Sequence, residues 1–149
     1  MAIDVVAETV IMRPRSEVAA FVMDPANDQS WIKAFTSVEP LTEPPTAVGS
    51  RVKRVAGFMG RRIVYVMEVV ELEPESRLVM KTLEGPFPMT VHYEFEPLGP
   101  EGESGTLVRI RNQGGSDGFM AALGPLIGWM VNRQVKKDLA LLRSVLEAE

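Results

Sequence analysis

The spacing of hydrophobic and polar residues changes along the chain, and each spacing predicts a different element. Residues 3–12 are rich in Val, Ile and Thr, which is typical of a β-strand. In residues 16–23, Val18, Phe21 and Val22 follow the i, i+3, i+4 spacing that places three apolar side chains on one helix face. The chain is therefore expected to open with a strand followed by a short helix.

A change to strand-like spacing follows a second helix signal. Asp24 before Pro25 combines a helix N-cap with proline at the first helical position, and this predicts a short helix over about residues 27–32. From Thr36 to Gln113, apolar runs are separated by short turn sequences rich in Pro and Gly. Parallel crossovers need a dozen or more residues, so these short connections favour hairpins. We expect an antiparallel meander.

Two of these strands alternate cleanly, which predicts one buried face and one solvated face. One face of the first strand carries Met89, Val91, Tyr93 and Phe95, and the other carries Thr90, His92, Glu94 and Glu96. In the second strand, Thr106, Val108, Ile110 and Asn112 oppose Leu107, Arg109, Arg111 and Gln113. Residues 62–72 are apolar on both faces apart from three charged side chains, so this segment is either a central strand or partly covered on its outer side.

The last segment has the strongest helical pattern. An apolar stripe runs through Ile127, Val131, Val135, Leu139, Leu142 and Leu146. The pattern predicts a helix from Pro125 to about Glu147, with residues 119–123 as a separate preceding turn because Gly124 and Pro125 would kink or break a continuous helix. Only this helix is long enough to cover the apolar face of the sheet. The expected architecture is α+β, with a curved antiparallel sheet around the helix, a cavity between them, and a single domain over residues 1–149.

Composition and charge exclude several classes of function. The 149 residues carry 16 Lys and Arg against 20 Asp and Glu, a formal charge of −4, which makes nucleic acid a poor partner. The absence of Cys removes disulfides, thiolate metal sites and cysteine nucleophiles. No apolar stretch approaches the roughly 20 residues that span a bilayer, and residues 1–12 lack the features of a signal peptide, so we expect a cytoplasmic protein.

The order strand, two short helices, six-strand meander and long helix resembles the START-related superfamily (also called SRPBCC) of lipid-transfer proteins, plant pollen allergens and polyketide cyclase/dehydrases. The resemblance covers nearly the whole chain. Local sequences similar to the bacterial polyketide-cyclase-type branch are Pro14-Arg15-Ser16-Glu17-Val18, Asp24-Pro25-Ala26-Asn27 leading to Trp31, Val48-Gly49-Ser50, Phe58-Met59-Gly60-Arg61-Arg62, and the tail with Arg133, Asp138 and Leu142. The resemblance implies a helix-grip fold with an internal pocket for an apolar or amphipathic small molecule, and no shared catalytic residue.

The predicted ligand-binding residues are apolar or polar side chains in phase with the inner face of the sheet or next to the helix stripe. They are Trp31, Arg54, Phe58, Tyr65, Met67, Met80, Thr82, Tyr93, Ile110, Asn112, Leu123, Ile127, Met130 and Gln134. The methionines suit an adaptable hydrophobic wall, and the buried polar groups would orient a bound molecule. We expect no cofactor and no metal.

Most charged and polar residues outside this set are expected to face solvent. His92, the only histidine, has the phase of an exposed strand residue. The basic stretch Arg51, Lys53, Arg61 and Arg62 is expected to be a solvated face. Arg54 shares the inward phase and needs a partner, either a carboxylate such as Glu84 or Glu68 or an acidic ligand head group. The glycine-rich residues 114–118 lack the context of a phosphate loop and are interpreted as a gate or hinge.

The leading hypothesis is a carrier or sensor that encloses a lipid-like or polyketide-like molecule. An alternative is a polyketide aromatase/cyclase or dehydratase, in which Tyr65, Tyr93 or Arg54 would polarise a carbonyl or move a proton. A second alternative is a protein-interaction module that uses residues 62–72 as its partner surface. The partners expected are thus a hydrophobic ligand and a second copy of the chain in a homodimer.

Overall fold

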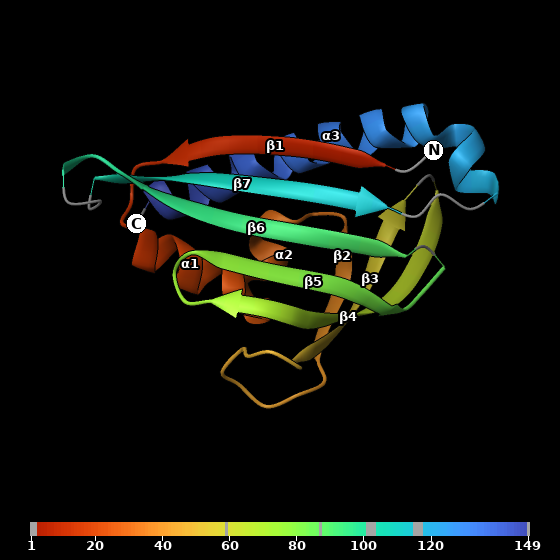
Figure 1. Cartoon of the computed structure of the whole chain (residues 1–149), viewed down its shortest axis with the longest axis horizontal. Coiled ribbons are helices and arrows are strands. Elements are labelled where there is room, and N and C mark those ends of the chain that lie inside the picture. The colour runs from red at the N-terminus through yellow and green to blue at the C-terminus, as the bar shows by residue number, and fades with distance from the viewer. Residues whose placement is uncertain (1–2, 59, 87, 101–103, 115–117, 149) are drawn as a thin grey trace.

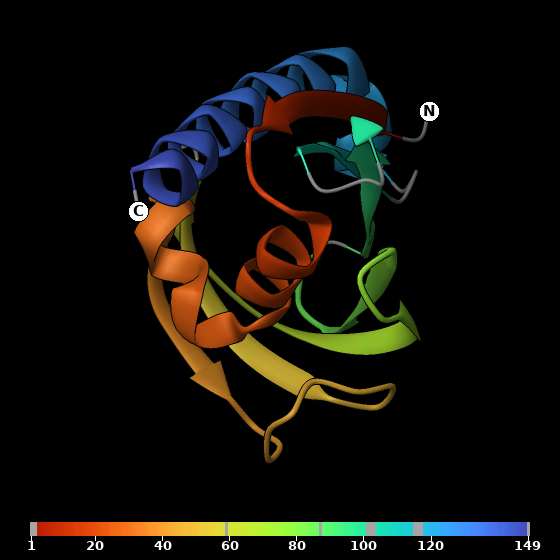
Figure 2. The same ribbon diagram turned by 90° about the vertical axis from the view of Figure 1, so that its left-hand side faces the viewer.

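One curled antiparallel sheet of seven strands dominates the computed structural model, and a long helix closes its open side (Figures 1 and 2). The structure describes residues 3–58, 60–86, 88–100, 104–114 and 118–148, without the side chains of Phe58 and of residues 118–125. The strands are β1 (Asp4–Ile11), β2 (Phe35–Pro40), β3 (Arg51–Phe58), β4 (Arg61–Glu73), β5 (Arg77–Glu84), β6 (Met89–Leu98) and β7 (Gly105–Gly114). The helices are α1 (Arg15–Met23), the 3-10 turn η1 (Pro25–Asn27), α2 (Asp28–Trp31) and α3 (Gly118–Glu147).

The strand order β1-β7-β6-β5-β4-β3-β2 confirms the predicted meander. Each of β2 to β7 pairs with its neighbour in the chain, and β1 pairs with β7, from Asp4 opposite Gln113 to Ile11 opposite Thr106. The two alternating strands behave as predicted, because Tyr93, Phe95 and the set Thr106, Val108, Ile110 and Asn112 are buried. The helix-grip fold predicted from the sequence is confirmed.

The segment with apolar residues on both faces is an internal strand. Strand β4 lies between β3 and β5, and its pairing with β5 shifts at Val66/Met67 and again at Val69/Glu71. A bulge interrupts strict alternation and bends a strand. Val66 is buried although its neighbours Tyr65 and Met67 both line the inner face. After the second shift, Leu72 packs against the same core as Val69, so strict alternation does not hold along the whole strand.

The start of the long helix differs from the prediction. Helix α3 begins at Gly118 and continues through Pro125, so residues 119–123 belong to it and do not form a separate turn. Proline removes one backbone hydrogen bond and commonly bends a helix without ending it. Figure 1 shows α3 changing direction near its N-terminal end. The predicted buried stripe is confirmed at Ile127, Leu139 and Leu142.

The short helices lie inside the curve of the sheet, as the end-on view in Figure 2 shows. The Asp24 carboxylate accepts a hydrogen bond from the Ala26 amide, which confirms the predicted cap and starts η1. Helix α2 packs against α3, and α3 packs along β1. Within the described residues, no helix combines the length and the apolar content that crossing a bilayer requires.

The convex face of the sheet carries charged side chains in opposite pairs. Arg109 pairs with Glu8 at 2.6 Å and Arg111 pairs with Asp4 at 2.7 Å, across the β1–β7 ladder. His92 lies on the same face, half-buried, with Nε2 2.8 Å from Gln113 Oε1. This agrees with the outward phase predicted for His92.

Candidate functional site

A chamber of about 240 Å³ lies between the concave face of the sheet and helix α3. Strands β3 to β7 supply its floor, α3 supplies one wall, and residues at and after the end of α2 supply the other. Most of its lining is apolar or aromatic, including Ile63, Met67, Ile110, Ile127 and Val131. An apolar concavity with a few inward polar groups is the usual form of a small-molecule site.

Ten of the fourteen predicted site residues line this chamber: Trp31, Arg54, Tyr65, Met67, Thr82, Tyr93, Ile110, Asn112, Ile127 and Gln134. Met80 instead lines a second cavity, and Met130 is partly buried on α3 without being part of the chamber lining. The side chains of Phe58 and Leu123 lie outside the described residues. Strand alternation located the inward residues correctly because most of them belong to regular strands.

The second cavity, of about 520 Å³, lies under α1, η1 and residues 40–50. Arg54 and Tyr93 belong to the walls of both cavities, and Asp28 lines only the second. The sequence analysis did not anticipate this cavity. Its roof is formed by an irregular segment and short helices whose packing against β3 and β4 has no periodic signal.

A buried ion pair stands between the two cavities. Arg54 Nη2 donates to Asp28 Oδ2 at 2.7 Å, and the two side chains are 6% and 2% exposed. The guanidinium also lies over the Phe35 ring, with its central carbon 4.9 Å from the ring centroid. Both groups are removed from water almost completely.

Arg54 pairs with a carboxylate as predicted, but Glu84 and Glu68, the two residues suggested for this role, were wrong. Strand β3 places Arg54 inward as its phase suggested, but Glu68 pairs with Arg51 on the outer side and Glu84 is exposed. Asp28 was missed. It lies three residues before Trp31 in α2, and this i, i+3 spacing puts both side chains on the face of α2 that is buried.

Asp138 is a second buried carboxyl group that the site prediction missed. It lines the chamber from α3, is 8% exposed, and accepts a hydrogen bond from Gln134 Nε2 at 2.9 Å. Burial raises the pKa of Asp138 to about 6, although the Gln134 hydrogen bond opposes this rise. The i, i+4 spacing from Gln134 beside the apolar stripe is the signal that could have identified it.

The tyrosines of the chamber remain protonated at neutral pH. Burial raises the pKa of Tyr65 to about 12, and burial likewise raises the pKa of Tyr93, while the nearby Arg54 cation opposes both changes. Neutral phenols can donate or accept a hydrogen bond. They therefore offer orientation without adding charge.

Three buried donors around the chamber have no hydrogen-bond acceptor among the described residues. They are Trp31 Nε1, Arg54 Nε and Asn112 Nδ2. In contrast, the Thr82 hydroxyl is fully engaged, since it accepts from the Met89 amide at 3.1 Å and donates to the Met89 carbonyl at 3.3 Å. These nitrogen atoms are themselves covered by protein atoms, so they are unsatisfied groups within the wall and do not open onto the chamber.

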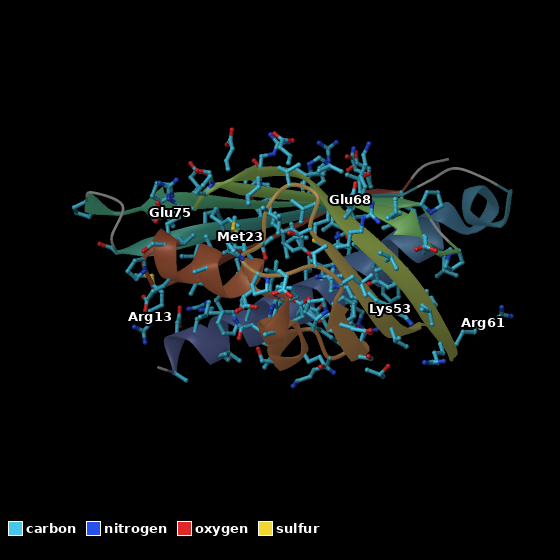
Figure 3. The ribbon with its side chains drawn as sticks, turned by 90° about the horizontal axis from the view of Figure 1, so that it is seen from below. Arg13, Met23, Lys53, Arg61, Glu68 and Glu75 are labelled. Atoms are coloured by element: carbon cyan, nitrogen blue, oxygen red, sulfur yellow. The ribbon has the colours of Figure 1, made fainter. Side chains whose placement is uncertain are left out.

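Other candidate chemistry is not assembled in the described part of the chain. No cluster of three His, Asp or Glu side chains there could hold a metal ion. The basic stretch is solvated as predicted, since Arg51, Lys53, Arg61 and Arg62 are exposed, and Arg61 extends beyond the sheet in Figure 3. The glycine-rich hinge was predicted over residues 114–118, and its members 115–117 lie outside the described residues.

Comparison with known proteins agrees with this architecture. A sequence model of the family described as polyketide cyclase / dehydrase and lipid transport matches residues 2–147. No curated protein matches the chain by sequence.

Solved structures of low sequence identity share the fold over nearly their whole length. The Zhui aromatase/cyclase from Streptomyces sp. R1128 is 15% identical, with 99% of this chain and 94% of that chain covered at a TM-score of 0.81. A START superfamily protein from Mycobacterium smegmatis is 14% identical, with 97% of each chain covered at a TM-score of 0.80. A protein from Thermus thermophilus is 23% identical, with 98% of this chain and 99% of that chain covered at a TM-score of 0.78.

Proposed function

The chain belongs to the polyketide cyclase / dehydrase and lipid transport family, and on that premise we propose that it encloses a hydrophobic or amphipathic small molecule between the sheet and helix α3. The observation that carries this proposal is the apolar chamber of about 240 Å³, whose lining includes the Tyr65 and Tyr93 phenols. Apolar burial would supply most of the affinity, at about 25 cal/mol per Å² of surface removed from water. The few polar groups would orient the ligand.

Native mass spectrometry of the freshly purified protein is the first test. A stoichiometric adduct that is released by denaturing extraction supports the proposal and identifies the ligand. A clean apo mass, together with no thermal shift across a panel of lipids and polyketide mimics, contradicts it.

A titration with the neutral fluorophore N-phenyl-1-naphthylamine locates the binding site. Ile63 lines the chamber, whereas its neighbour Val64 is 39% exposed on the opposite face of β4. Ile63→Trp fills the chamber and is expected to weaken binding at least about tenfold, since the space for the probe is lost. Val64→Trp is the matched control and should bind like wild type. Equal affinities in both variants would place the probe elsewhere.

Catalysis in the same chamber is a second candidate function, favoured by Asp138. A buried carboxyl with a pKa of about 6 can exchange protons near neutral pH, and the Tyr65 and Tyr93 phenols line the same chamber. A dehydratase or cyclase would convert the extracted ligand with loss of one water. Asp138→Asn should then abolish conversion and retain binding. A ligand recovered unchanged after incubation with wild-type protein supports the carrier function.

The cytoplasmic location, the homodimer and the use of β4 as a partner surface stay predictions. Light scattering over a range of concentrations tests self-association directly. An increase in mass with concentration, lost in a Val64→Lys variant, would support the interaction surface.

A further inference from the structure

The side of helix α3 that faces solvent combines exposed apolar and basic side chains. Leu126 is 50% exposed and Trp129 is 60% exposed, and no other described aromatic side chain is as exposed as Trp129. Further along the helix, Arg133, Lys136 and Lys137 are exposed as well. With 3.6 residues per turn, these five side chains lie within an arc of about 100° around the helix axis. They form one surface, the outer face of α3, which lies along the outside of the molecule in Figure 2.

The basic side chains of the outer face are not neutralised by neighbouring acids. Arg133, Lys136 and Lys137 form no ion pair with any of the described residues. Of the two acidic side chains on α3, Asp138 is buried and Glu147 is paired with an arginine at the C-terminal end of the helix. The three positive charges therefore remain available to a partner.

The outer face is basic although the chain as a whole is acidic. The formal charge of the chain is −4. Strand β1, which packs beside α3, carries Asp4 and Glu8, and each of these carboxylates is paired with an arginine of β7. Charge of opposite sign is thus segregated onto α3, and such a surface attracts an anionic partner.

The apolar members of the outer face indicate which anionic partner fits. The Arg133 guanidinium lies over the Trp129 ring, with its central carbon 5.6 Å from the ring centroid. Tryptophan favours the boundary between membrane and water, because its ring is apolar and its N–H is polar. Lysine and arginine next to such a ring attract anionic lipid head groups. Helices that bind to membrane surfaces combine the same two kinds of side chain.

We propose that the outer face of α3 docks on the surface of a membrane that contains anionic lipids. Leu126 and Trp129 enter the interface, and the three basic side chains contact the head groups. This docking needs no ligand in the chamber, so it does not rest on the proposed binding function. Ile127 and Val131, on the same part of α3, line the chamber. Docking therefore brings this wall of the chamber next to the lipid.

Co-sedimentation with lipid vesicles tests the docking directly. Phosphatidylcholine vesicles that contain about 30% phosphatidylglycerol should bind the protein at least about tenfold more tightly than phosphatidylcholine alone, because each of the three basic side chains adds to the attraction. The binding should weaken in about 0.5 M salt, which screens exposed charges. Equal affinity for both kinds of vesicle, or no binding to either, overturns the proposal.

Tryptophan fluorescence shows whether the outer face itself meets the lipid. The chain has two tryptophans, of which Trp31 is 1% exposed and Trp129 is 60% exposed. Emission should shift to shorter wavelength when anionic vesicles are added, since Trp129 leaves water. Trp129→Phe should abolish the shift, because Trp31 is already shielded from water. Vesicle binding without a shift in the wild-type protein contradicts docking through this face.

A matched pair of charge reversals separates the outer face from net charge. Lys136→Glu with Lys137→Glu should weaken binding to the anionic vesicles at least about tenfold. Lys53→Glu with Lys81→Glu is the control, because these lysines are exposed on β3 and β5 and the change in net charge is the same. The control should stay within about threefold of wild type. Equal losses in the two variants would assign the binding to net charge and contradict the proposal. Circular dichroism checks that both variants fold.

Two further measurements distinguish a membrane from other occupants of this face. Light scattering without vesicles should give the same mass for wild type and for Lys136→Glu with Lys137→Glu. A dimer that is lost in this variant would identify an interface between two copies and overturn the proposal. Full displacement of the vesicles by soluble polyglutamate of equal total charge would overturn it in favour of an acidic protein.

Discussion

The ion pair inside the sheet and the ion pairs on its convex face have almost the same geometry in very different surroundings. Arg54–Asp28 spans 2.7 Å with side chains 6% and 2% exposed, and Arg111–Asp4 spans 2.7 Å with side chains 44% and 45% exposed. The pKa of Asp28 is raised because burial outweighs the attraction of Arg54. The pKa of Asp4 is lowered because the Arg111 hydrogen bond outweighs a small burial effect. At the same contact distance, solvent exposure therefore decides whether the pKa of the carboxyl group is raised or lowered.

Exposed and buried ion pairs contribute differently to the stability of the fold. An exposed pair is surrounded by water whether or not it forms, so its net effect on stability is small. A buried pair has already lost the hydration of both ions, and each ion depends on the other. The interior pair thus stands in the wall between the two cavities and is costly to break, whereas the exterior pairs can be changed with little effect on stability.

Removal of one partner of the buried Arg54–Asp28 pair should have the largest effect on stability. Asp28→Ala leaves the Arg54 guanidinium buried and uncompensated, so the free energy of unfolding should fall by about 3–5 kcal/mol. Urea denaturation followed by circular dichroism measures this change. A loss below about 1 kcal/mol would mean that water reaches Arg54 and that the interior and exterior pairs are alike.

Replacement of both interior partners should recover most of that loss. The double variant Asp28→Leu with Arg54→Met removes both ions and keeps apolar volume, so its free energy of unfolding should return by about 1–4 kcal/mol from the single variant. The same denaturation experiment applies. Stability as low as in Asp28→Ala would show that packing, not charge, causes the loss.

Replacement of Asp138 should have an intermediate effect on stability that depends on pH. Its pKa is about 6 in the folded state against 3.8 for the ordinary carboxyl group, so the folded state favours the protonated form. The stability gained from protonation is complete below about pH 4 and is lost as the pH rises through 6.

Asp138→Asn stays uncharged and should be more stable than wild type at pH 7 by about 1 kcal/mol, allowing for partial solvent access. The difference between the two proteins should vanish toward pH 4. Melting temperatures at several pH values measure it, and a difference independent of pH would rule out titration of Asp138 as the cause.

The smallest effect is expected on the convex face. Glu8→Gln removes the charge that Arg109 contacts at 2.6 Å, and the free energy of unfolding should change by at most about 1 kcal/mol. The change should shrink further in high salt, because salt screens exposed charges. A loss comparable to that of Asp28→Ala would erase the distinction between the two faces.

The predictions from sequence succeeded where structure repeats locally. Alternation in β6 and β7 correctly placed Tyr93, Ile110 and Asn112 on the inner face, and the apolar stripe of α3 correctly placed Ile127 there. They failed where a local rule met an exception, as at the bulges of β4 and at Pro125 inside α3. A periodic pattern reports the average conformation of a segment and not its interruptions.

The sequence by itself determined the strand meander, the amphipathic long helix and the inner face of the sheet, because these depend on spacings of two and 3.6 residues within one segment. Only the tertiary structure decided that Arg54 pairs with Asp28, 26 residues away on another element, and that Asp138 lines the same chamber. It also decided the second cavity under residues 40–50. Partners and cavities depend on how α2 and α3 pack on the curved sheet, and that packing has no signature in the spacing of any single segment.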